Sequence, residues 1–272
     1  MIHCEVCPHH CPLTETTRGI CGARTERDGR SFPLNYGKAT ALHLAPIEKK
    51  PLFHFHPGSQ ILSYGSYGCN MRCTFCQNHE ISMMRKDTGS YISPEELAES
   101  AASMQPFGSI GLAFTYNEPT ICPEFIVDTG RLIHEKGMKN VVVTNGFMAP
   151  ATMEQLLTVA DAFNIDLKAF TDRFYLAMGG RLEPVKESIR AAAGRAHLEV
   201  TTLVIPGEND SVEEMEALSS WLAAISPEIP LHLSRFFPSY LMLEKPPTPR
   251  STLTTLHAVA KRHLERVYLG NI

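Results

Sequence analysis

The feature that most constrains the fold of this chain is the alternation of strand-like and helix-like stretches from residue 60 onward. Apolar runs rich in β-branched residues, such as residues 140–146, are followed by helix-like stretches such as residues 149–161. This pattern favours parallel βαβ units with right-handed crossovers. Six such units can be counted, whereas a closed barrel has about eight. We therefore predict an α/β fold with a partial (β/α)6 TIM-like barrel. A doubly wound open sheet is the alternative, since the pattern alone does not separate the two.

Turn and capping residues indicate where these stretches begin and end. Ser93, Pro94 and Glu96 predict the start of one helix, with Ser93 as the N-cap and Glu96 completing a capping box. Gly137 predicts the end of the next helix. The predicted strands cover residues 60–66, 109–116, 140–146, 162–170, 197–207, 230–238 and 267–271, and the predicted helices cover residues 93–104, 124–137, 149–161, 183–196, 211–225 and 249–267.

Residues 1–58 do not follow this alternation and are rich in Cys, His, Gly and Pro. Because so short a segment cannot bury a sufficient apolar core of its own, we expect metal to stabilise it. We predict two parts, a small Cys-rich, metal-binding N-terminal segment over residues 1–58 and a barrel over residues 59–272.

Composition excludes several classes of protein. Of 272 residues, 43% are hydrophobic and 20% are charged, which is typical of a globular chain. The net charge of -4 argues against a nucleic-acid-binding surface, which would need an excess of basic residues. We find no apolar run of membrane-spanning length and no signal peptide, so we predict a cytoplasmic protein without a membrane partner. In that compartment the eight cysteines are expected to bind metal rather than form disulfides.

Charged side chains follow several of the predicted strands. In both parallel architectures the active site lies at the carboxyl ends of the strands. A charge is costly there unless it is paired or used. Each of these side chains could instead form a buried ion pair or a surface charge. The candidate site residues chosen in this way are Glu118, Asp166, Lys168, His232 and Arg235.

Three cysteines, Cys69, Cys73 and Cys76, follow the first predicted strand with the spacing C-x3-C-x2-C. A zinc site closed by protein needs four ligands, and a cuboidal iron–sulfur cluster usually has four thiolates. Three thiolates in one loop therefore leave one metal position for another ligand. From the spacing alone, a zinc knuckle and an open iron–sulfur site both remain.

The segment CNMRCTFC, with Phe75 before its last cysteine, resembles the signature of the radical S-adenosylmethionine (SAM) superfamily. The resemblance implies that Cys69, Cys73 and Cys76 hold a [4Fe-4S] cluster whose fourth iron binds SAM. It further implies reductive cleavage of SAM to a 5′-deoxyadenosyl radical, which abstracts hydrogen from a substrate that the sequence does not identify. An electron donor such as flavodoxin or ferredoxin would be a partner.

Other segments are similar to the branch that activates glycyl-radical enzymes, such as the pyruvate formate-lyase activating enzyme. That branch has a Gly-Gly-Glu-Pro motif where this chain has Tyr116 and Asn117 followed by Glu118 and Pro119. The similarity implies that Glu118 binds the amino group of SAM. A glycyl residue of a partner protein, or another protein or peptide, is then a candidate substrate.

The same similarity gives roles to further residues. Asn145 becomes a contact to the ribose or carboxylate of SAM, Asp166 a residue of the SAM region or of a cation site, and Lys168 a polar residue of the cavity. His232 and Arg235 become contacts to SAM or substrate. The segments IEKKPLFHFHPGS and CQNHEIS also resemble an AmmeMemoRadiSam-type subgroup.

A second set of cysteines lies near the start of the chain, with the spacing C-x2-C-x3-C-x9-C. Four cysteines can close a tetrahedral zinc site or hold a second, fully ligated cluster. His9 or His10 could replace one thiolate. We expect a structural role for the set, which comprises Cys4, Cys7, Cys11 and Cys21, and a core position for Cys122.

Two other functions remain open at this point. One is an iron–sulfur electron-transfer or metal-binding protein without SAM chemistry, in which protein ligands would fill all four iron positions. The other is a zinc-ribbon interaction module joined to an inert barrel. Binding of SAM discriminates the first from the enzyme, and metal content discriminates the second.

Overall fold

The computed structural model describes residues 1–83 and 89–272, and this part of the chain forms one eight-stranded mixed sheet together with three two-stranded sheets. The strand order of the large sheet is β14-β13-β12-β11-β10-β9-β7-β6. Neighbours from β7 to β14 are parallel, and β6 runs antiparallel to β7. The strands are β6 (Ala41–Pro46), β7 (Gln60–Gly65), β9 (Ser109–Phe114), β10 (Lys139–Thr144), β11 (Ala162–Asp166), β12 (His197–Val204), β13 (Leu231–Arg235) and β14 (Val267–Gly270).

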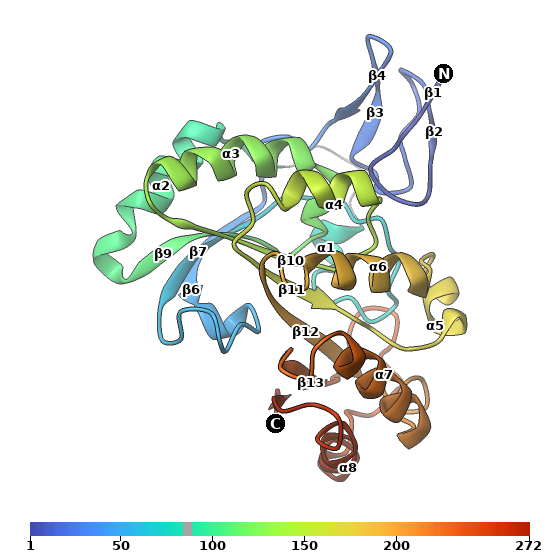
Figure 1. Ribbon diagram of the computed structural model, residues 1–272. Helices are drawn as coiled ribbons and strands as arrows, with labels where there is room; N and C mark the ends of the chain where they lie inside the picture. The colour runs from blue at the N-terminus through green and yellow to red at the C-terminus, as the bar shows by residue number, and fades with distance from the viewer. Residues whose placement is uncertain (84–88) are drawn as a thin grey trace.

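The helices cover one face of this sheet, on the outer side in Figure 1. The largest apolar core lies between them and the strands and includes Leu112, Phe163 and Val200 from the sheet. Helices on one face only, with β6 and β14 as free edges, confirm the partial barrel rather than a doubly wound sheet. The helices are α1 (His79–Ser82), α2 (Pro94–Ser103), α3 (Pro123–Glu135), α4 (Pro150–Leu156), α5 (Asp172–Ala177), α6 (Leu182–Ala192), α7 (Val212–Ile225) and α8 (Arg250–Ala260).

Local sequence signals explain several of these elements. The predicted capping box is present, because Ser93 accepts a hydrogen bond from the Glu96 amide and Glu96 accepts one from the Ser93 amide. The final predicted strand forms as β14 and pairs with β13. Each of the seven predicted strands corresponds to an observed strand among the described residues, whereas β6 and α5 were not predicted.

The opposite, inner face of the sheet is filled at the amino ends of the strands by the segment between β6 and β7. Ile47 and Leu52 from this segment pack on Ile61 and Val141 and are fully buried. The side-chain amide of Asn164 in β11 donates to the Pro51 carbonyl (2.8 Å). The segment therefore closes one end of the barrel interior and leaves the other end for a site.

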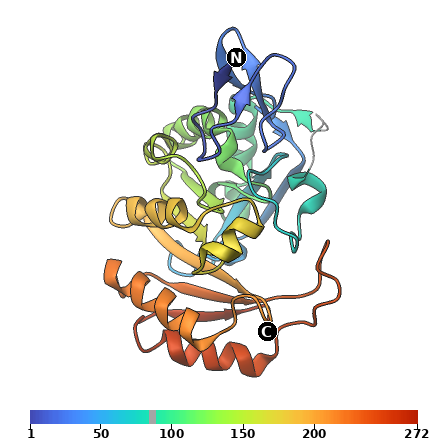
Figure 2. The same cartoon turned by 90° about the vertical axis from the view of Figure 1, so that its right-hand side faces the viewer.

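The N-terminal segment contains two short antiparallel pairs, β1 (Ile2–His3) with β2 (Pro12–Leu13) and β3 (Arg24–Arg27) with β4 (Arg30–Pro33). In Figure 2 these pairs lie at the top, and α7 and α8 at the bottom. A third pair joins β5 (Lys38–Ala39) to β8 (Ser90–Tyr91). Because β6 belongs to the large sheet, the boundary predicted near residue 58 does not coincide with the edge of the sheet, and the division into two parts stays a prediction.

Among the described helices, none is both long and apolar enough to cross a membrane.

Candidate active site

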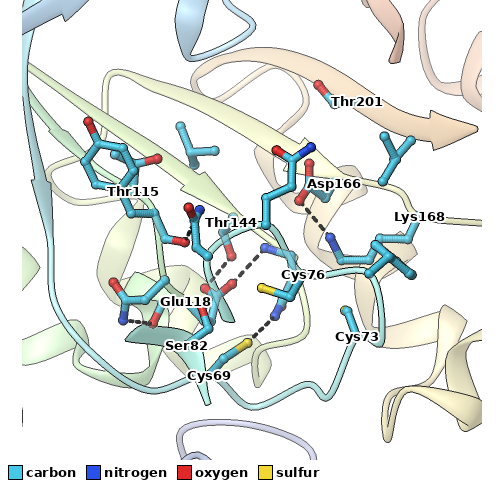
Figure 3. A pocket seen from close by; sticks show the side chains of 18 of the residues that line it. Cys69, Cys73, Cys76, Ser82, Thr115, Glu118, Thr144, Asp166, Lys168 and Thr201 are labelled. Atoms are coloured by element: carbon cyan, nitrogen blue, oxygen red, sulfur yellow. Dashed lines mark hydrogen bonds and ion pairs between the residues drawn. The ribbon is translucent and has the colours of Figure 1, made fainter. Parts of the chain in front are cut away.

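A cavity of about 270 Å³ lies at the carboxyl ends of the strands, opposite the closed end of the barrel. Figure 3 shows that side chains from β10, β11, β12 and the cysteine loop point into it. The structure brings most of the predicted site residues together here. Those that line the cavity are Cys69, Cys73, Phe75, Cys76, Glu118, Asn145, Asp166 and Lys168.

The cysteine loop leaves β7 through Gly68, whose φ of 89° lies in the left-handed region. A Cβ added there would lie 2.6 Å from the Cys21 carbonyl oxygen, so only glycine fits this close approach. The loop is held from the other side by the Arg72 amide, which donates to the Met178 carbonyl (2.8 Å). Contacts at both sides fix the backbone that carries the three thiols.

The thiols are buried or half-buried, and Cys73 is only 7% exposed. Burial raises the pKa of Cys73 to about 11, although the nearby Lys168 ammonium opposes this rise. The side-chain amide of Asn145 lies 3.7 Å from the Cys69 sulfur and donates to the Asn70 side-chain oxygen (2.9 Å). A thiolate at this position therefore has a donor nearby, and a bound metal would stabilise its charge further.

Glu118 lies at the end of β9 and is 2% exposed. Its Oε1 accepts hydrogen bonds from the Thr120 amide (3.1 Å), the Thr120 hydroxyl (2.6 Å) and the Thr144 hydroxyl (2.6 Å). Its Oε2 accepts one bond from the Asn145 amide (2.8 Å). Burial raises the pKa of Glu118 despite these donors. The carboxylate thus joins β9 to β10, and Oε2 keeps a lone pair for one further donor.

Of the two residues that replace glycines before Glu118, Tyr116 keeps a glycine-like backbone. Tyr116 has a φ of 72°, in the left-handed region that favours glycine. Its ring packs so closely on Gly65 that a Cβ added there would lie 2.8 Å from it. The Asn117 side chain accepts from the Ser66 amide (3.0 Å) and donates to the Gly68 carbonyl (3.0 Å). These contacts tie the end of β9 to the start of the cysteine loop.

Asp166 and Lys168 form an ion pair at the end of β11, with Lys168 Nζ 2.8 Å from Asp166 Oδ2. Burial alone would lower the pKa of Lys168, but the charge of Asp166 raises it above its usual range. The Lys168 backbone amide donates a hydrogen bond to the Tyr175 hydroxyl oxygen (3.0 Å). The pair presents both a fixed cation and a carboxylate oxygen to the cavity beside Cys73.

With this geometry in view, the comparisons with known proteins identify the family. The sequence model described as "Radical SAM superfamily" matches residues 63–219, which is more than half of the chain. This chain belongs to the radical SAM superfamily.

Relatives within and around the superfamily agree with this assignment. An uncharacterized protein of Methanocaldococcus jannaschii is 38% identical over 276 residues, covering 100% of this chain and 81% of that protein. The pyruvate formate-lyase-activating enzyme of Clostridium pasteurianum is 25% identical over 158 residues, covering 56% of this chain and 65% of the enzyme. A radical SAM methyltransferase from Sphaerobacter thermophilus has a similar fold, with a TM-score of 0.61 and 16% identity over 79% of this chain and 67% of that one.

Radical SAM enzymes use a [4Fe-4S] cluster and SAM, and the donor set of the cavity fits both. Three thiols are the soft ligands that an iron–sulfur cluster requires. They face a cavity that also holds a carboxylate, an ammonium and an amide, which suit the charged and polar groups of SAM. As the side chains stand, no three or more described His, Cys, Asp or Glu residues are arranged to hold a metal ion. Loading of the radical SAM site would therefore need the thiols to turn toward a common centre.

The structure does not bring His232 and Arg235 to the radical SAM cavity, which corrects their predicted placement. His232 Nε2 donates to Glu199 Oε2 (2.6 Å) deep at the closed end of the barrel. Arg235 Nε donates to the Thr248 carbonyl (2.7 Å), and its guanidinium lies over the Phe237 ring. Within β13 it is Ser234, between the two, that lines the cavity. A strand-end rule predicts which segment is near the site but not how deep each residue lies.

The N-terminal cysteines form a separate group outside the cavity. Cys4, Cys7, Cys11 and Cys21 are all free thiols and between 5% and 9% exposed. Burial, with smaller contributions from the charges of the other three cysteines, raises the pKa of Cys7 to about 12. Cys122 lies in the main apolar core, as predicted, and does not line the cavity.

Sequence reasoning missed several residues of the site, among them Thr144 and Ser234 in the cavity lining and Lys50 beside Tyr116. Lys50 is 4% exposed, and its ammonium lies 4.8 Å from the centre of the Tyr116 ring. Within the part of the chain that the structure describes, no acidic side chain pairs with it. Burial lowers the pKa of Lys50 to about 8, with a smaller contribution from Lys49. A lysine inside the run IEKKPLFHF was the available signal, since that run enters the barrel.

Proposed function

We propose that this chain is a radical SAM enzyme that cleaves SAM reductively at a [4Fe-4S] cluster held by Cys69, Cys73 and Cys76. The observation that supports the proposal is that these three thiols share one cavity with Glu118 and with the Asp166–Lys168 pair. Three protein thiolates leave one iron for SAM, so the cluster and SAM must occupy one continuous space. A cavity with thiols on one wall and charged groups on another meets this requirement.

A [4Fe-4S] cluster held by Cys69, Cys73 and Cys76 would supply one electron to break the bond from sulfur to C5′ of bound SAM, which would give methionine and, after hydrogen abstraction from the substrate, 5′-deoxyadenosine. Each turnover that consumes SAM in this way needs one electron from a low-potential donor, for which we propose a flavodoxin or ferredoxin. The substrate is left as a radical with one hydrogen atom fewer.

The residues of this chain would bind and orient the reactants. Glu118 Oε2 accepts the amino group of SAM, because its other oxygen is already used by Thr120 and Thr144. Asn145 orients Cys69 and contacts the ribose or carboxylate of SAM. Lys168 favours the thiolate of Cys73 through its positive charge. Phe75, 5% exposed and 6.1 Å from Phe174 between ring centres, excludes water from the cluster side of the cavity.

For the substrate we propose a glycyl residue of a partner protein. The support is the relative from Clostridium pasteurianum, whose name states that it activates another enzyme, pyruvate formate-lyase. The free edges of the sheet at β6 and β14 also leave the barrel open at its side, which suits a protein loop better than a closed barrel would. This second point is an analogy at the level of the fold.

The first experiment tests the SAM chemistry. The protein is purified without oxygen, reconstituted with iron and sulfide, and incubated with SAM and dithionite. We expect about four irons bound at this site and formation of 5′-deoxyadenosine, detected by mass spectrometry. Cys73→Ala should abolish the product, whereas Cys122→Ala, a buried cysteine away from the cavity, should not. Retained product in Cys73→Ala would refute the proposed ligand set.

The second experiment tests the substrate. Cells of the source organism are grown with glycine deuterated at Cα, so that their proteins carry the label. Gel filtration of the cell extract then separates the proteins from the small molecules. Incubation with the enzyme, SAM and dithionite should transfer deuterium into 5′-deoxyadenosine. Transfer only with the small-molecule fraction would exclude a protein substrate. An intact cluster that yields no 5′-deoxyadenosine with either fraction would favour an iron–sulfur electron carrier instead.

A further inference from the structure

We propose that Cys4, Cys7, Cys11 and Cys21 bind one zinc ion as a tetrathiolate centre, and that this centre holds the radical SAM cysteine loop in position. Cys4 follows β1 and Cys11 precedes β2, Cys7 lies in the connection between these strands, and Cys21 lies in the turn before β3. This zinc centre is distinct from the cavity, and its existence does not depend on the proposed function.

The first support is burial without a sufficient apolar core. All four thiols are less than 10% exposed. Around Cys4 and Cys11 the apolar neighbours are Leu13, Ile2 and Val6. So small a cluster cannot by itself order a segment of this length, because conformational entropy opposes the ordering of each residue. A metal bound by four thiolates is the usual remedy in such segments.

The second support is that two of the four sulfurs, those of Cys4 and Cys11, have a hydrogen-bond donor. The Ile20 amide lies 3.4 Å from the Cys11 sulfur, and the Ser31 hydroxyl lies 3.5 Å from the Cys4 sulfur. A neutral thiol is a weak acceptor, so donors aimed at these two buried sulfurs indicate positions suited to thiolate.

The third support is convergence of the sulfurs. A Cβ added to Gly19 would lie 3.6 Å from both the Cys11 and the Cys21 sulfur, so these two sulfurs face one small space. The Cys4 amide donates to the Cys11 carbonyl (3.0 Å), which places these two cysteines opposite each other on paired backbone. Four cysteines with one C-x2-C pair match the tetrahedral ligand set of a structural zinc site, so we assign one zinc ion to this group.

The side chains are not already arranged around a metal, but this does not argue against the zinc centre. The same is true of Cys69, Cys73 and Cys76, in a family whose members bind a cluster there. In both groups the backbone is in place, and rotation about the Cα–Cβ bonds would bring the sulfurs together.

The second half of the proposal rests on contacts between this segment and the radical SAM loop. His9 Nε2 donates to the Asn70 carbonyl (2.7 Å), and the Arg72 guanidinium donates to the Ile20 carbonyl. Asn70 in turn accepts from Asn145, whose amide lies beside the Cys69 sulfur. His9 lies between two of the proposed zinc ligands and Ile20 next to a third, so loss of the ion would loosen both contacts.

The test uses the full chain, purified without reconstitution and without SAM or dithionite, so that its failure is separate from failure of the SAM chemistry. We expect about one zinc per chain by elemental analysis. Cobalt supplied in place of zinc should give the visible absorption of tetrahedral cobalt thiolate. Cys11→Ser should lose the metal and Cys122→Ser should keep it. Absence of zinc and of the cobalt spectrum in the wild type, or about four extra irons in place of zinc, would overturn the zinc assignment.

The coupling is measured by hydrogen exchange over residues 66–78 in the zinc-loaded and chelator-treated wild type. We expect faster exchange in this loop after zinc removal, while β12 at the far side of the barrel is unchanged. If Cys11→Ser fails to fold, the chelator experiment still decides the point. Equal exchange in the loop with and without zinc would refute the positioning role and leave a zinc site that acts only on its own segment.

Discussion

The two cysteine groups of this molecule differ in what surrounds them. The four N-terminal thiols are buried, and two of them, Cys4 and Cys11, accept hydrogen bonds from β4 and from the N-terminal segment. Of the three thiols after β7, Cys69 and Cys76 are only half-buried, and all three face a cavity. A centre that is enclosed by its ligands has no place for a substrate, whereas an open one does. The comparison supports the proposed difference between a structural centre at the N-terminal cysteines and a reactive one at the cavity.

The same contrast extends to the buried cations near each group. Arg24, beside the N-terminal group, is 2% exposed and makes a two-pronged ion pair with Glu124 (2.7 and 3.0 Å). Lys50, beneath the cavity, is 4% exposed and lies over a tyrosine ring. The buried charge of Arg24 therefore has an acidic partner, whereas that of Lys50 has none among the described residues. Unfavourable features of this kind are common near functional sites, where stability is lower than it could be.

The largest expected effect separates the two groups by activity. Cys76→Ala should reduce 5′-deoxyadenosine formation to background, because the cluster loses one of its three proposed ligands. Cys11→Ala should keep measurable activity with an altered metal content, because the zinc centre only supports the loop. Both are measured in the same anaerobic assay, with iron and zinc counted in each sample. Complete loss of 5′-deoxyadenosine formation in both variants would contradict the proposed difference in role between the two cysteine groups.

The next effect concerns how firmly the N-terminal segment is attached. Arg24→Met should lower the free energy of unfolding by about 2 kcal/mol, since it breaks a buried pair whose partner is itself partly exposed. Arg24 also donates to the Ile121 carbonyl, which would lose its partner. Denaturant unfolding measures the change.

The matched control for that variant is Arg195→Met, which removes a similar two-pronged pair with Glu154 at the surface. Both side chains of this pair are about half exposed, at 49% and 57%, so its loss should leave stability unchanged. A similar decrease in the free energy of unfolding in both variants would show that the Arg24–Glu124 pair contributes no more than a surface ion pair does.

A smaller effect, of opposite sign, is expected at Lys50. Lys50→Met should raise stability at pH 7 by about 1 kcal/mol, because a buried charge without an acidic partner is replaced by an apolar chain of similar length.

The pH dependence of the stability difference tests whether burial of the Lys50 charge is its cause. The folded pKa of Lys50 is about 8, whereas an unfolded lysine titrates near about 10.4. Between these values the unfolded chain holds a proton that the folded chain lacks, so wild-type stability rises with pH. The advantage of Lys50→Met should therefore shrink from pH 8 to about 10. If the free energies of unfolding of the wild type and Lys50→Met change with pH in parallel, the pKa of Lys50 is not lowered by burial in the folded protein.

Much of this arrangement could be predicted from sequence, and the failures have physical reasons. The strand-end rule placed Glu118, Asp166 and Lys168 at one cavity, because carboxyl ends of parallel strands meet at one edge. It misplaced His232, because depth along β13 depends on where the strand begins.

Other features depended on contacts that are distant in sequence. The strand β6 (Ala41–Pro46) has no helix partner and pairs antiparallel, so the βαβ alternation could not reveal it. Lys50 reaches Tyr116 only because the segment after β6 folds into the barrel. The contacts of the N-terminal segment with Asn70 and Arg72 join residues more than fifty positions apart, and no local pattern indicates them.

The smallest expected effect tests those contacts most directly. His9→Ala removes the hydrogen bond to the Asn70 carbonyl and the edge contact with the Phe147 ring, whose centre lies 5.2 Å away. One hydrogen bond of this kind contributes about 1 kcal/mol, so global stability should change little. Amides of residues 69–72 should nevertheless exchange faster, while the zinc content stays the same because no cysteine is altered. His3→Ala, an exposed histidine in the same segment, is the matched control and should change neither quantity. If His9→Ala leaves exchange in the loop unchanged, the two cysteine groups are neighbours without being coupled, and the N-terminal centre then acts on its own segment alone.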